Sequence, residues 1–265
     1  MNLLHALLLG ILQGLTEFIP VSSTAHLLIG QTLLGLPADD AMFSFLVIVQ
    51  LGTIVSLFVF YWKDLLVLVK AFFAKPFSTQ ENKLAWYIIV ATIPALIAGY
   101  LLKDAVKAIF KTPMLEASIR LFSAAILLTL VEWLGKRVRK LDAMTWLDAL
   151  IIGLFQVIAV FPGASRSGAT IAGGMARGFD RPSAARFAFL MSVPVMLAAG
   201  GYQMLDVLKM PDLGAFLPLL AVGFATAAVV GWFAVKWLIG YLSQHSLYAF
   251  AIYCAALGAL TFLLR

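Results

Sequence analysis

The stretch Phe18-Ile19-Pro20-Val21-Ser22-Ser23-Thr24 interrupts an otherwise apolar run that covers residues 3–35. Proline removes a backbone donor and disfavours helix at the residue before it, so a helix that enters this stretch should break here. A second apolar run, 146–178, contains a similar interruption, Pro162-Gly163-Ala164-Ser165-Arg166-Ser167-Gly168. Two broken helices in one apolar chain are the features that decide the fold.

The composition predicts the solvent that surrounds these breaks. The chain has 265 residues, of which 63% are hydrophobic and 12% are charged, whereas globular domains are about 45–50% apolar and roughly 25% charged. A soluble protein with so little charge could not cover its own surface, so we expect an integral membrane protein. The net charge of +6 is spread over short loops without an arginine–aromatic stripe, which argues against nucleic-acid binding. The N-terminus lacks the features of a signal peptide, so we expect the first run to be mature structure.

Six uninterrupted runs reach the length of about 20 apolar residues that a spanning helix needs. They cover roughly 42–62, 84–102, 115–135, 183–207, 214–239 and 245–264. Non-helical backbone at membrane depth is tolerated only where it is buried in protein or lines a polar cavity. We therefore predict an all-α integral membrane protein with six transmembrane helices and two re-entrant helix–loop–helix hairpins, whose non-helical segments cover Gln13–His26 and Pro162–Thr170.

The two interrupted runs also match each other. Gly10-Ile11-Leu12-Gln13 aligns with Gly153-Leu154-Phe155-Gln156, and the Pro and Ser of the first break align with those of the second. Each hairpin is followed by three spanning runs, an odd number, so the second half should enter the membrane upside down. The sequence thus predicts one membrane domain with inverted halves of about 1–138 and 139–265, and a site where the two breaks meet.

Basic residues predict the orientation. The loops on one side carry five of the 19 lysines and arginines, namely Lys103, Lys107, Lys111, Lys209 and Arg265. The loops on the other side carry twelve, namely Lys63, Lys70, Lys75, Lys83, Lys136, Arg137, Arg139, Lys140, Arg177, Arg181, Arg186 and Lys236. Cytoplasmic loops carry the excess of positive charge, so the second side is expected in the cytoplasm and both termini outside.

Polar side chains gather at the first break. An ionisable group inside a membrane is costly and is therefore a candidate for function. Glu17 is such a group, and it lies one helical turn after Gln13, so that both side chains share a face. The nearby residues Ser22, Ser23, Thr24 and His26 add hydroxyls and an imidazole that could act as acid, base or nucleophile. The alternative for Glu17 is a polar contact with a neighbouring helix.

The second break adds a fixed positive charge. Arg166 is flanked by small and hydroxyl residues, among them Gly163, Ser165, Ser167 and Thr170. Arginine fits phosphate oxygens with a planar fork, and a helix N-terminus attracts anions, so this segment predicts a phosphate cradle. The alternative is a helix-packing segment in which Arg166 pairs with Glu17. Another pair, Glu116 and Arg120, has the i,i+4 spacing of an ion pair within one helix.

The chain resembles a known family at these two breaks. Gln13-Gly14-Leu15-Thr16-Glu17-Phe18-Ile19-Pro20-Val21-Ser22-Ser23-Thr24-Ala25-His26 and Pro162-Gly163-Ala164-Ser165-Arg166-Ser167-Gly168-Ala169-Thr170 look like the two signature motifs of the bacterial undecaprenyl-diphosphate phosphatases, also called bacitracin-resistance proteins. The resemblance covers the whole chain in length and hydropathy. One departure is Gln13, where many members carry a second glutamate.

The resemblance implies a hydrolase that converts undecaprenyl diphosphate to undecaprenyl phosphate for reuse in cell-wall synthesis. It implies a site that opens to the outer face of the cytoplasmic membrane and a divalent cation, Mg²⁺ or Ca²⁺. Glu17 would assist acid–base chemistry or hold the metal, and Ser23 or His26 would be the nucleophile or its activator. Arg166, with Ser165 and Thr170, would bind the diphosphate.

Other readings stay open at this point. The inverted repeat also suits a transporter or flippase that moves undecaprenyl phosphate inward, and a structural membrane scaffold is a third possibility. The sequence does not choose between Ser23 and His26 as nucleophile, and it does not identify the metal. It does not fix the oligomeric state either, with a homodimer among the states left open.

Overall fold

The computed structural model describes residues 1–102, 112–160, 165–209 and 213–264. Within these ranges the protein has eleven α-helices and a single turn of 3-10 helix, and it has no β-strand. The predicted site residue Gly163 and the basic residues Lys103, Lys107, Lys111 and Arg265 lie outside the described residues. The all-α prediction is confirmed for the described part of the chain.

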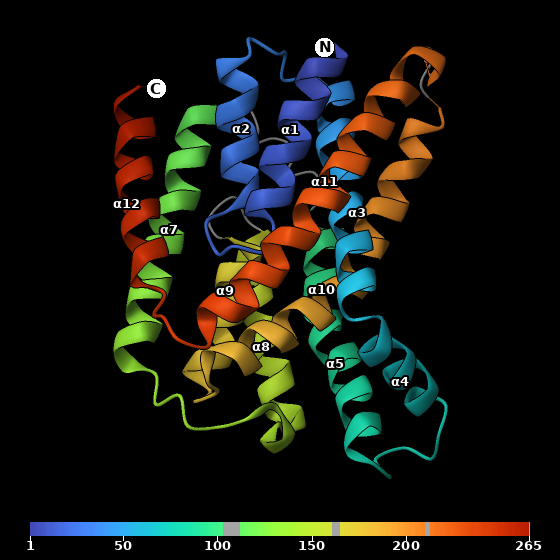
Figure 1. Cartoon of the computed structure of the whole chain (residues 1–265), viewed down its shortest axis with the longest axis vertical. Coiled ribbons are helices and arrows are strands. Elements are labelled where there is room, and N and C mark those ends of the chain that lie inside the picture. The colour runs from blue at the N-terminus through green and yellow to red at the C-terminus, as the bar shows by residue number, and fades with distance from the viewer. Residues whose placement is uncertain (103–111, 161–164, 210–212, 265) are drawn as a thin grey trace.

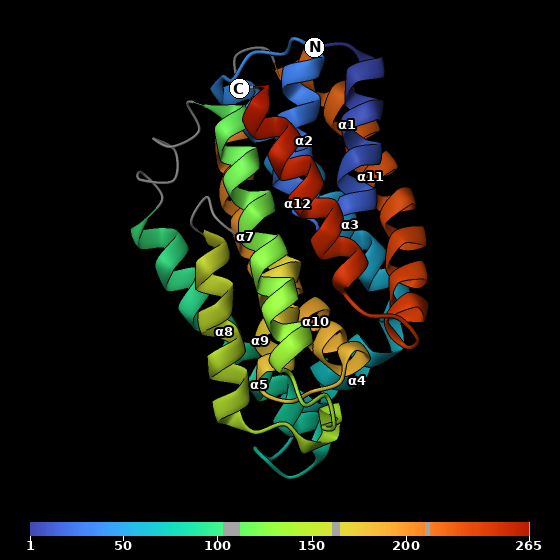
Figure 2. The ribbon, with the colours of Figure 1, turned by 90° about the vertical axis from the view of Figure 1, so that its left-hand side faces the viewer.

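Two pairs of short helices flank the breaks. They are α1 (Leu3–Thr16) with α2 (Ser23–Leu33), and α8 (Trp146–Val160) with α9 (Arg166–Ala176). The longest of them has 15 residues, or about 23 Å at 1.5 Å per residue, which is less than the roughly 30 Å of a bilayer's hydrocarbon core. Figures 1 and 2 place α1 and α2 in the upper part of the molecule, near both termini, and α8 and α9 in the lower part.

The non-helical segments are shorter than predicted. Helix α1 continues through Thr16, α2 already begins at Ser23, and α9 begins at Arg166. Proline clashes with the carbonyl four residues before it, so Pro20 prevents regular helix only from about Thr16 onward. The first break is therefore limited to residues 17–22. The prediction that all of Gln13–His26 and Pro162–Thr170 is non-helical was wrong for residues 13–16, 23–26 and 166–170, which are helical.

Five long helices account for five of the six predicted spans. They are α3 (Asp40–Phe60), α5 (Gln80–Leu101), α7 (Pro113–Leu134), α10 (Arg181–Val207) and α11 (Leu213–Leu242), and each is long and apolar enough to cross a membrane. The run predicted over 245–264 forms α12 (Tyr248–Leu263), which has only 16 residues. A sixth span thus remains a prediction, while the multi-pass character of the protein is clear.

One helix was not predicted. Helix α4 (Trp62–Phe72) directly follows α3 and buries only Leu68, while Trp62, Leu66, Val67 and Val69 are exposed beside two lysines. A short helix with apolar and basic exposed side chains is typical of a segment that lies at a membrane surface. Its 11 residues were too few and too mixed to predict a helix from hydropathy alone.

The helices pack in a pattern that repeats between the two halves. Helix α1 packs against α11 as α8 packs against α5, and α3 packs against α11 as α10 packs against α5. Two further large contacts, α3 with α10 and α7 with α12, join corresponding helices. Exchanging α1, α3, α5 and α7 for α8, α10, α11 and α12 therefore turns these contacts into one another.

The matched glycines of the two hairpins explain part of this pattern. A Cβ atom on Gly10 would lie 2.7 Å from the carbonyl oxygen of Gly223 in α11, and one on Gly153 would lie 2.4 Å from that of Ala91 in α5. Both distances are too short for any side chain. The two hairpins thus use the same device, a glycine one turn before the matched glutamine, to bring their first helix onto a long helix of the other half.

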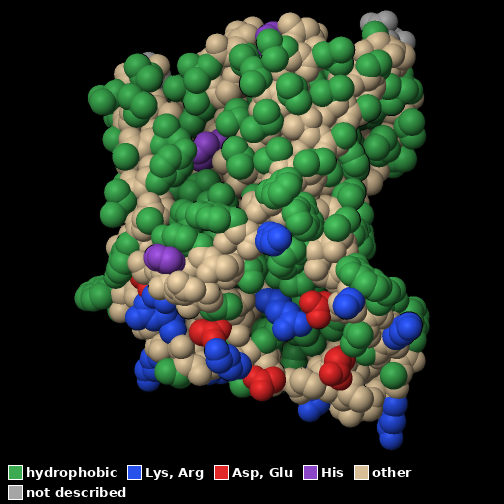
Figure 3. Space-filling view, viewed as in Figure 1, with side chains coloured by type: hydrophobic (Ala, Val, Ile, Leu, Met, Phe, Trp, Pro, Cys, Tyr) green, Lys and Arg blue, Asp and Glu red, His purple; other side chains and the backbone are tan. Residues whose placement is uncertain are grey.

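Charge is concentrated at one end of the molecule. Figure 3 shows Lys, Arg, Asp and Glu side chains at the lower end of this face, below a mostly apolar surface, and Figure 1 shows both termini at the opposite end. Buried acids organise the charged end. Glu132 pairs with Arg137 and Arg181 and accepts a hydrogen bond of 3.0 Å from the backbone N–H of Leu247. Asp148 pairs in the same way with Arg139 and Arg177.

Candidate functional site

Glu17 is the centre of the polar group at the first break. Its side chain is buried, and its Oε2 atom accepts hydrogen bonds from Gln13 Nε2 at 2.6 Å and from Ser23 Oγ at 2.7 Å. Its Oε1 atom is paired with the guanidinium of Arg166 from the second break. The two breaks, 149 residues apart in the sequence, therefore meet at one carboxylate. The Glu17–Arg166 pair that the sequence suggested as an alternative is present.

The backbone before Ser23 is strained. Ser22 has φ of 68° and ψ of 89°, in a region that a residue with a side chain adopts only at a cost of about 1–3 kcal/mol. This conformation ends the break and starts α2 at Ser23, so that the Ser23 hydroxyl lies in the first turn and reaches back to Glu17. The strain lies directly before Ser23, whose hydroxyl donates a hydrogen bond to Glu17.

The second break presents Arg166 from a capped helix. Ser165 is the N-cap of α9, and its Oγ atom accepts a hydrogen bond of 3.1 Å from the N–H of Gly168. The first four N–H groups of a helix have no partner within it, and this cap takes one of them. Arg166 follows as the first residue of α9. The start of α9 therefore offers both a helix N-terminus and a guanidinium.

Two predicted residues of the second break support its structure. Ser167 Oγ donates to the carbonyl oxygen of Ile19 at 3.3 Å, which joins α9 to the first break. Thr170 Oγ1 donates to the carbonyl oxygen of Arg166 at 2.8 Å and is buried within α9. Neither side chain borders the cavity described below, so their predicted contact with substrate is not provided by this arrangement.

Among the described residues, His26 makes its hydrogen bonds with Ser22 and Tyr253 and not with Glu17. Its Nδ1 atom is 2.9 Å from the carbonyl oxygen of Ser22, and its Nε2 atom is 2.8 Å from the hydroxyl of Tyr253, on which the imidazole also stacks. Because a carbonyl only accepts, Nδ1 carries the proton and Nε2 accepts from Tyr253. Tyr253 is 227 residues away in α12, and nothing in the sequence predicted this contact.

A cavity of about 140 Å³ lies where the breaks meet. Six of the predicted site residues border it, namely Glu17, Ser22, Ser23, Thr24, Ser165 and Arg166. Three further residues border it that were not predicted as site residues, namely Gln50, Arg120 and Ala159. Gln13, His26, Ser167 and Thr170 do not. Hydroxyl, carboxylate and guanidinium groups dominate this lining, as expected for a site that takes an anion.

The oxygen atoms near Glu17 suit a hard divalent cation. Magnesium is bound in proteins through one or two carboxylates together with substrate phosphates and water. Glu17 supplies the carboxylate, and the buried Oε1 atom of Gln13 has no hydrogen-bond partner among the described residues. No cluster of three or more His, Cys, Asp or Glu side chains occurs in the described part of the chain. A cation held here would therefore depend on oxygen atoms of the substrate.

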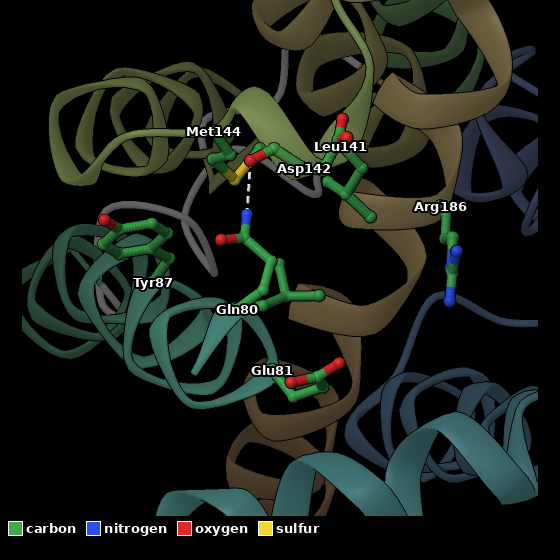
Figure 4. Close-up of a pocket in the computed structure, with 8 residues that line it drawn as sticks. Gln80, Glu81, Tyr87, Leu141, Asp142, Met144 and Arg186 are labelled. Carbon is green, nitrogen blue, oxygen red and sulfur yellow. Dashed lines mark hydrogen bonds between the residues drawn. The ribbon is translucent and has the colours of Figure 1, made fainter. Parts of the chain in front are cut away.

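A second, larger cavity of about 200 Å³ lies elsewhere, between the start of α5, the 3-10 turn (Leu141–Ala143) and the start of α10. Figure 4 shows that Gln80 reaches across it to the backbone of Asp142, with Glu81 and Arg186 on its walls. It contains none of the predicted site residues. The smaller cavity at the breaks is thus the candidate site.

Comparison with known proteins agrees with the motifs at these breaks. The family model described as bacitracin resistance protein BacA matches residues 6–260. The chain belongs to this BacA family. The match includes both hairpins and all five long helices, so family membership applies to the whole arrangement described above and not to one motif.

Relatives in the BacA family are similar over nearly their full length. A protein of Rubrobacter xylanophilus is 42% identical over 98% of this chain and 97% of its own length. A protein of Chlorobium phaeobacteroides is 41% identical over 97% and 95%. A third, from Anaeromyxobacter dehalogenans, is 41% identical over 98% and 90%. All three bear the name undecaprenyl-diphosphatase.

Proposed function

We propose that this protein is a membrane-embedded phosphatase that hydrolyses undecaprenyl diphosphate to undecaprenyl phosphate and inorganic phosphate. The observation that carries the proposal is the hydrogen-bonded set Ser23–Glu17–Arg166, which borders a cavity between two broken helices. The names of the BacA relatives supply the substrate. Recycling of this lipid carrier would serve peptidoglycan synthesis and bacitracin resistance.

Ser23 is the nucleophile that the geometry supports best. A nucleophilic hydroxyl needs a base within about 2.6–3.2 Å, and Ser23 Oγ lies 2.7 Å from Glu17 Oε2. In the proposed step, Ser23 Oγ bonds to the terminal phosphorus, its proton passes to Glu17, and the bond to the bridging oxygen breaks to release undecaprenyl phosphate. Water then cleaves the phosphoserine to give inorganic phosphate and restore Ser23. His26, held between Ser22 and Tyr253, would position the start of α2.

Arg166 and the N-terminus of α9 would stabilise the charge of the transferred group. Phosphoryl transfer depends on in-line positioning and on neutralisation of the phosphoryl oxygens. Arg166 already pairs with Glu17, so its guanidinium lies beside the proposed base and the proposed nucleophile. Ser165, which caps α9 and borders the same cavity, adds a hydroxyl. Substrate would thus replace part of the Glu17–Arg166 contact.

A divalent cation, Mg²⁺ or Ca²⁺, fits this site in our proposal. It would be held by Glu17 and by diphosphate oxygens. When bound, it would supply positive charge to the leaving and transferred phosphoryl groups. The amide of Gln13 is neutral, so Glu17 would provide the negative charge for this role.

The proposed topology is six spans with two re-entrant hairpins in inverted halves of about 1–138 and 139–265. Three spans separate the hairpins, which makes the second enter from the opposite side, and the matched packing of α1 on α11 and α8 on α5 supports this. The charged end would face the cytoplasm, as its basic residues favour. Both termini and the opening of the site would then face outward from the cytoplasmic membrane.

The repeated packing also supports a second candidate function. Inverted halves around a central site are the usual architecture of transporters that work by alternating access, so the protein could carry undecaprenyl phosphate inward after cleaving the diphosphate. Movement of the carrier across liposomes by a variant that cannot hydrolyse would support this function. If the active wild type does not move undecaprenyl phosphate across liposomes, the transport function is excluded.

The test of the phosphatase is release of inorganic phosphate from undecaprenyl diphosphate by purified protein with Mg²⁺ or Ca²⁺. We expect activity in the wild type, no activity after Glu17→Ala or Arg166→Ala, and a ³²P label from the terminal phosphate on Ser23 under rapid acid quench. Wild type that releases no phosphate with any divalent cation would overturn the proposal. A label on His26 would keep the reaction and exclude Ser23 as nucleophile.

A further inference from the structure

Arg120 borders the same cavity as Glu17 and Arg166, although it lies in α7, outside both hairpins. Its side chain is only 6% exposed. The sequence predicts it as an intrahelical partner of Glu116, and that pair is present: Arg120 donates to Glu116 Oε1 from Nε at 2.9 Å and from an amino group at 2.7 Å. A partner in the same helix does not explain why the guanidinium also lies at the cavity.

The Glu116–Arg120 pair is incomplete. Arginine has five N–H donors, and the two hydrogen bonds to Glu116 use only two of them, both on one carboxylate oxygen. The other oxygen, Glu116 Oε2, is buried without a partner among the described residues. Burial of an ion pair is costly unless its remaining hydrogen-bonding groups are satisfied. If the pair had only a structural role, its remaining N–H donors and the Oε2 atom of Glu116 would be expected to have hydrogen-bond partners.

A second polar group accompanies Arg120. Gln50 of α3 borders the cavity as well, and the hydrogen bonds found among the described residues use its backbone carbonyl, as acceptor from Thr53, and not its side-chain amide. Two long helices thus bring a guanidinium and an amide to the cavity that the hairpins form. The candidate site has a polar wall that neither motif encodes.

We propose that Arg120, with Gln50, binds the second phosphoryl group of the substrate, so that Arg166 and Arg120 each hold one phosphate of a diphosphate. The inference rests on the proposed phosphatase function and adds the basis of its preference for diphosphate over monophosphate. Arg166 is already paired with Glu17, so a diphosphate needs a further cation, and a guanidinium fork matches phosphate oxygens. The donors of Arg120 that Glu116 does not use meet this need.

The test compares two inhibitors that are not cleaved, methylenediphosphonate and inorganic phosphate, against hydrolysis of undecaprenyl diphosphate. Wild type should bind the diphosphonate more tightly. In Arg120→Met its inhibition constant should rise about 10- to 100-fold, the effect expected from loss of one or two charge-assisted hydrogen bonds, while the constant for phosphate changes little. The ratio of the two constants reports on the second phosphate, and general damage to the fold would not change it selectively.

Arg120→Met leaves the buried carboxylate of Glu116 without its partner, so three further variants separate this effect from the loss of phosphate binding. The double variant Glu116→Gln with Arg120→Met removes both charges and should show the same loss of preference. Glu116→Gln alone keeps Arg120 and should keep the preference. Arg120→Lys keeps the charge without the fork and should reduce the ratio several-fold. An active protein in which the double variant or Arg120→Lys retains the wild-type ratio would overturn the inference, whereas an inactive wild type would overturn the phosphatase itself.

Discussion

The charged end and the cavity at the breaks both contain buried acids paired with arginine, but they use them differently. Glu132 binds two arginines and a backbone N–H, and Asp148 binds two arginines and the N–H and hydroxyl of Thr145. Gln13 and Glu116, which are bonded to the cavity residues Glu17 and Arg120, each retain a buried oxygen without a partner among the described residues. Glu17 is paired as fully as Glu132, so what separates the two groups is that Glu17 and Arg166 border a cavity.

The largest effect is expected at Glu17. Glu17→Gln keeps the shape and removes the proposed base, so phosphate release from undecaprenyl diphosphate should fall by about 1000-fold, within the range for loss of a general base. Its thermal unfolding in detergent should change far less than its activity. Glu17→Asp, which keeps the charge but shortens the reach, is the matched control and should retain part of the activity. A Glu17→Gln protein with wild-type turnover would contradict the role given to this acid.

Glu132 should give the reverse result. Glu132→Ala leaves Arg137, Arg181 and the N–H of Leu247 without their buried acceptor, which we expect to cost about 3–5 kcal/mol of stability. Denaturant or thermal unfolding in micelles measures this loss, and the fraction that remains folded should keep the wild-type KM. If instead KM rises while the unfolding transition is unchanged, the distinction between the two groups of acids fails.

A smaller effect is expected at the link between the first break and α12. Tyr253→Phe removes the hydroxyl that His26 Nε2 accepts from, at a cost of about 1–3 kcal/mol for the buried acceptor left unpaired. If His26 only positions α2, then Tyr253→Phe should lower stability and leave the phosphate label on Ser23. His26→Gln serves as the matched variant, since its amide can replace one of the two hydrogen bonds. Complete loss of the label in either folded variant would show that His26 takes part in the reaction.

The smallest effect concerns Asp180, in the loop before α10. Partial burial acts to raise the pKa of Asp180, but hydrogen bonds from Lys140 and from Ser183 outweigh it and hold the pKa below its ordinary value. A lowered pKa means that the carboxylate stabilises the fold at neutral pH and loses this contribution as the pH falls through the folded-state pKa. Asp180→Asn should therefore be slightly less stable at pH 7, with the difference shrinking as the pH falls below the ordinary pKa of aspartate and vanishing below the lowered folded-state pKa. A difference that is constant over this range would exclude the ion pair as its cause.

The sequence predicted the parts of the site that depend on local rules. Pro20 predicted the first break, since its ring excludes regular helix over the residues before it, and Glu17 and Arg166 were found because a charge in an apolar run is conspicuous. The limits of the break were overestimated, because residue type does not show that α1 persists to Thr16 or that a left-handed Ser22 starts α2 at once.

The contacts that depend on distant packing could not be predicted. Arg120 was found as a helix pair from its spacing, but spacing does not tell which face of α7 borders a cavity. Gln50 is one polar residue in a long apolar span, and Tyr253 meets His26 across 227 residues. Helix α4 was missed because a short helix at a membrane surface has neither the length of a span nor the polarity of a loop.

The partners of Glu132 also affect how the protein is made. This acid lies near the end of α7, but Arg181 and the N–H of Leu247 follow it by 49 and 115 residues. At about 5–20 residues per second of synthesis, the ribosome needs roughly 6–23 s to deliver the last of these groups. Until then the carboxylate can pair with Arg137, five residues later, and with Arg181 once it is made, but it lacks this backbone donor. The charged end therefore receives one of its buried hydrogen bonds only after residue 247 has been made, close to the end of synthesis.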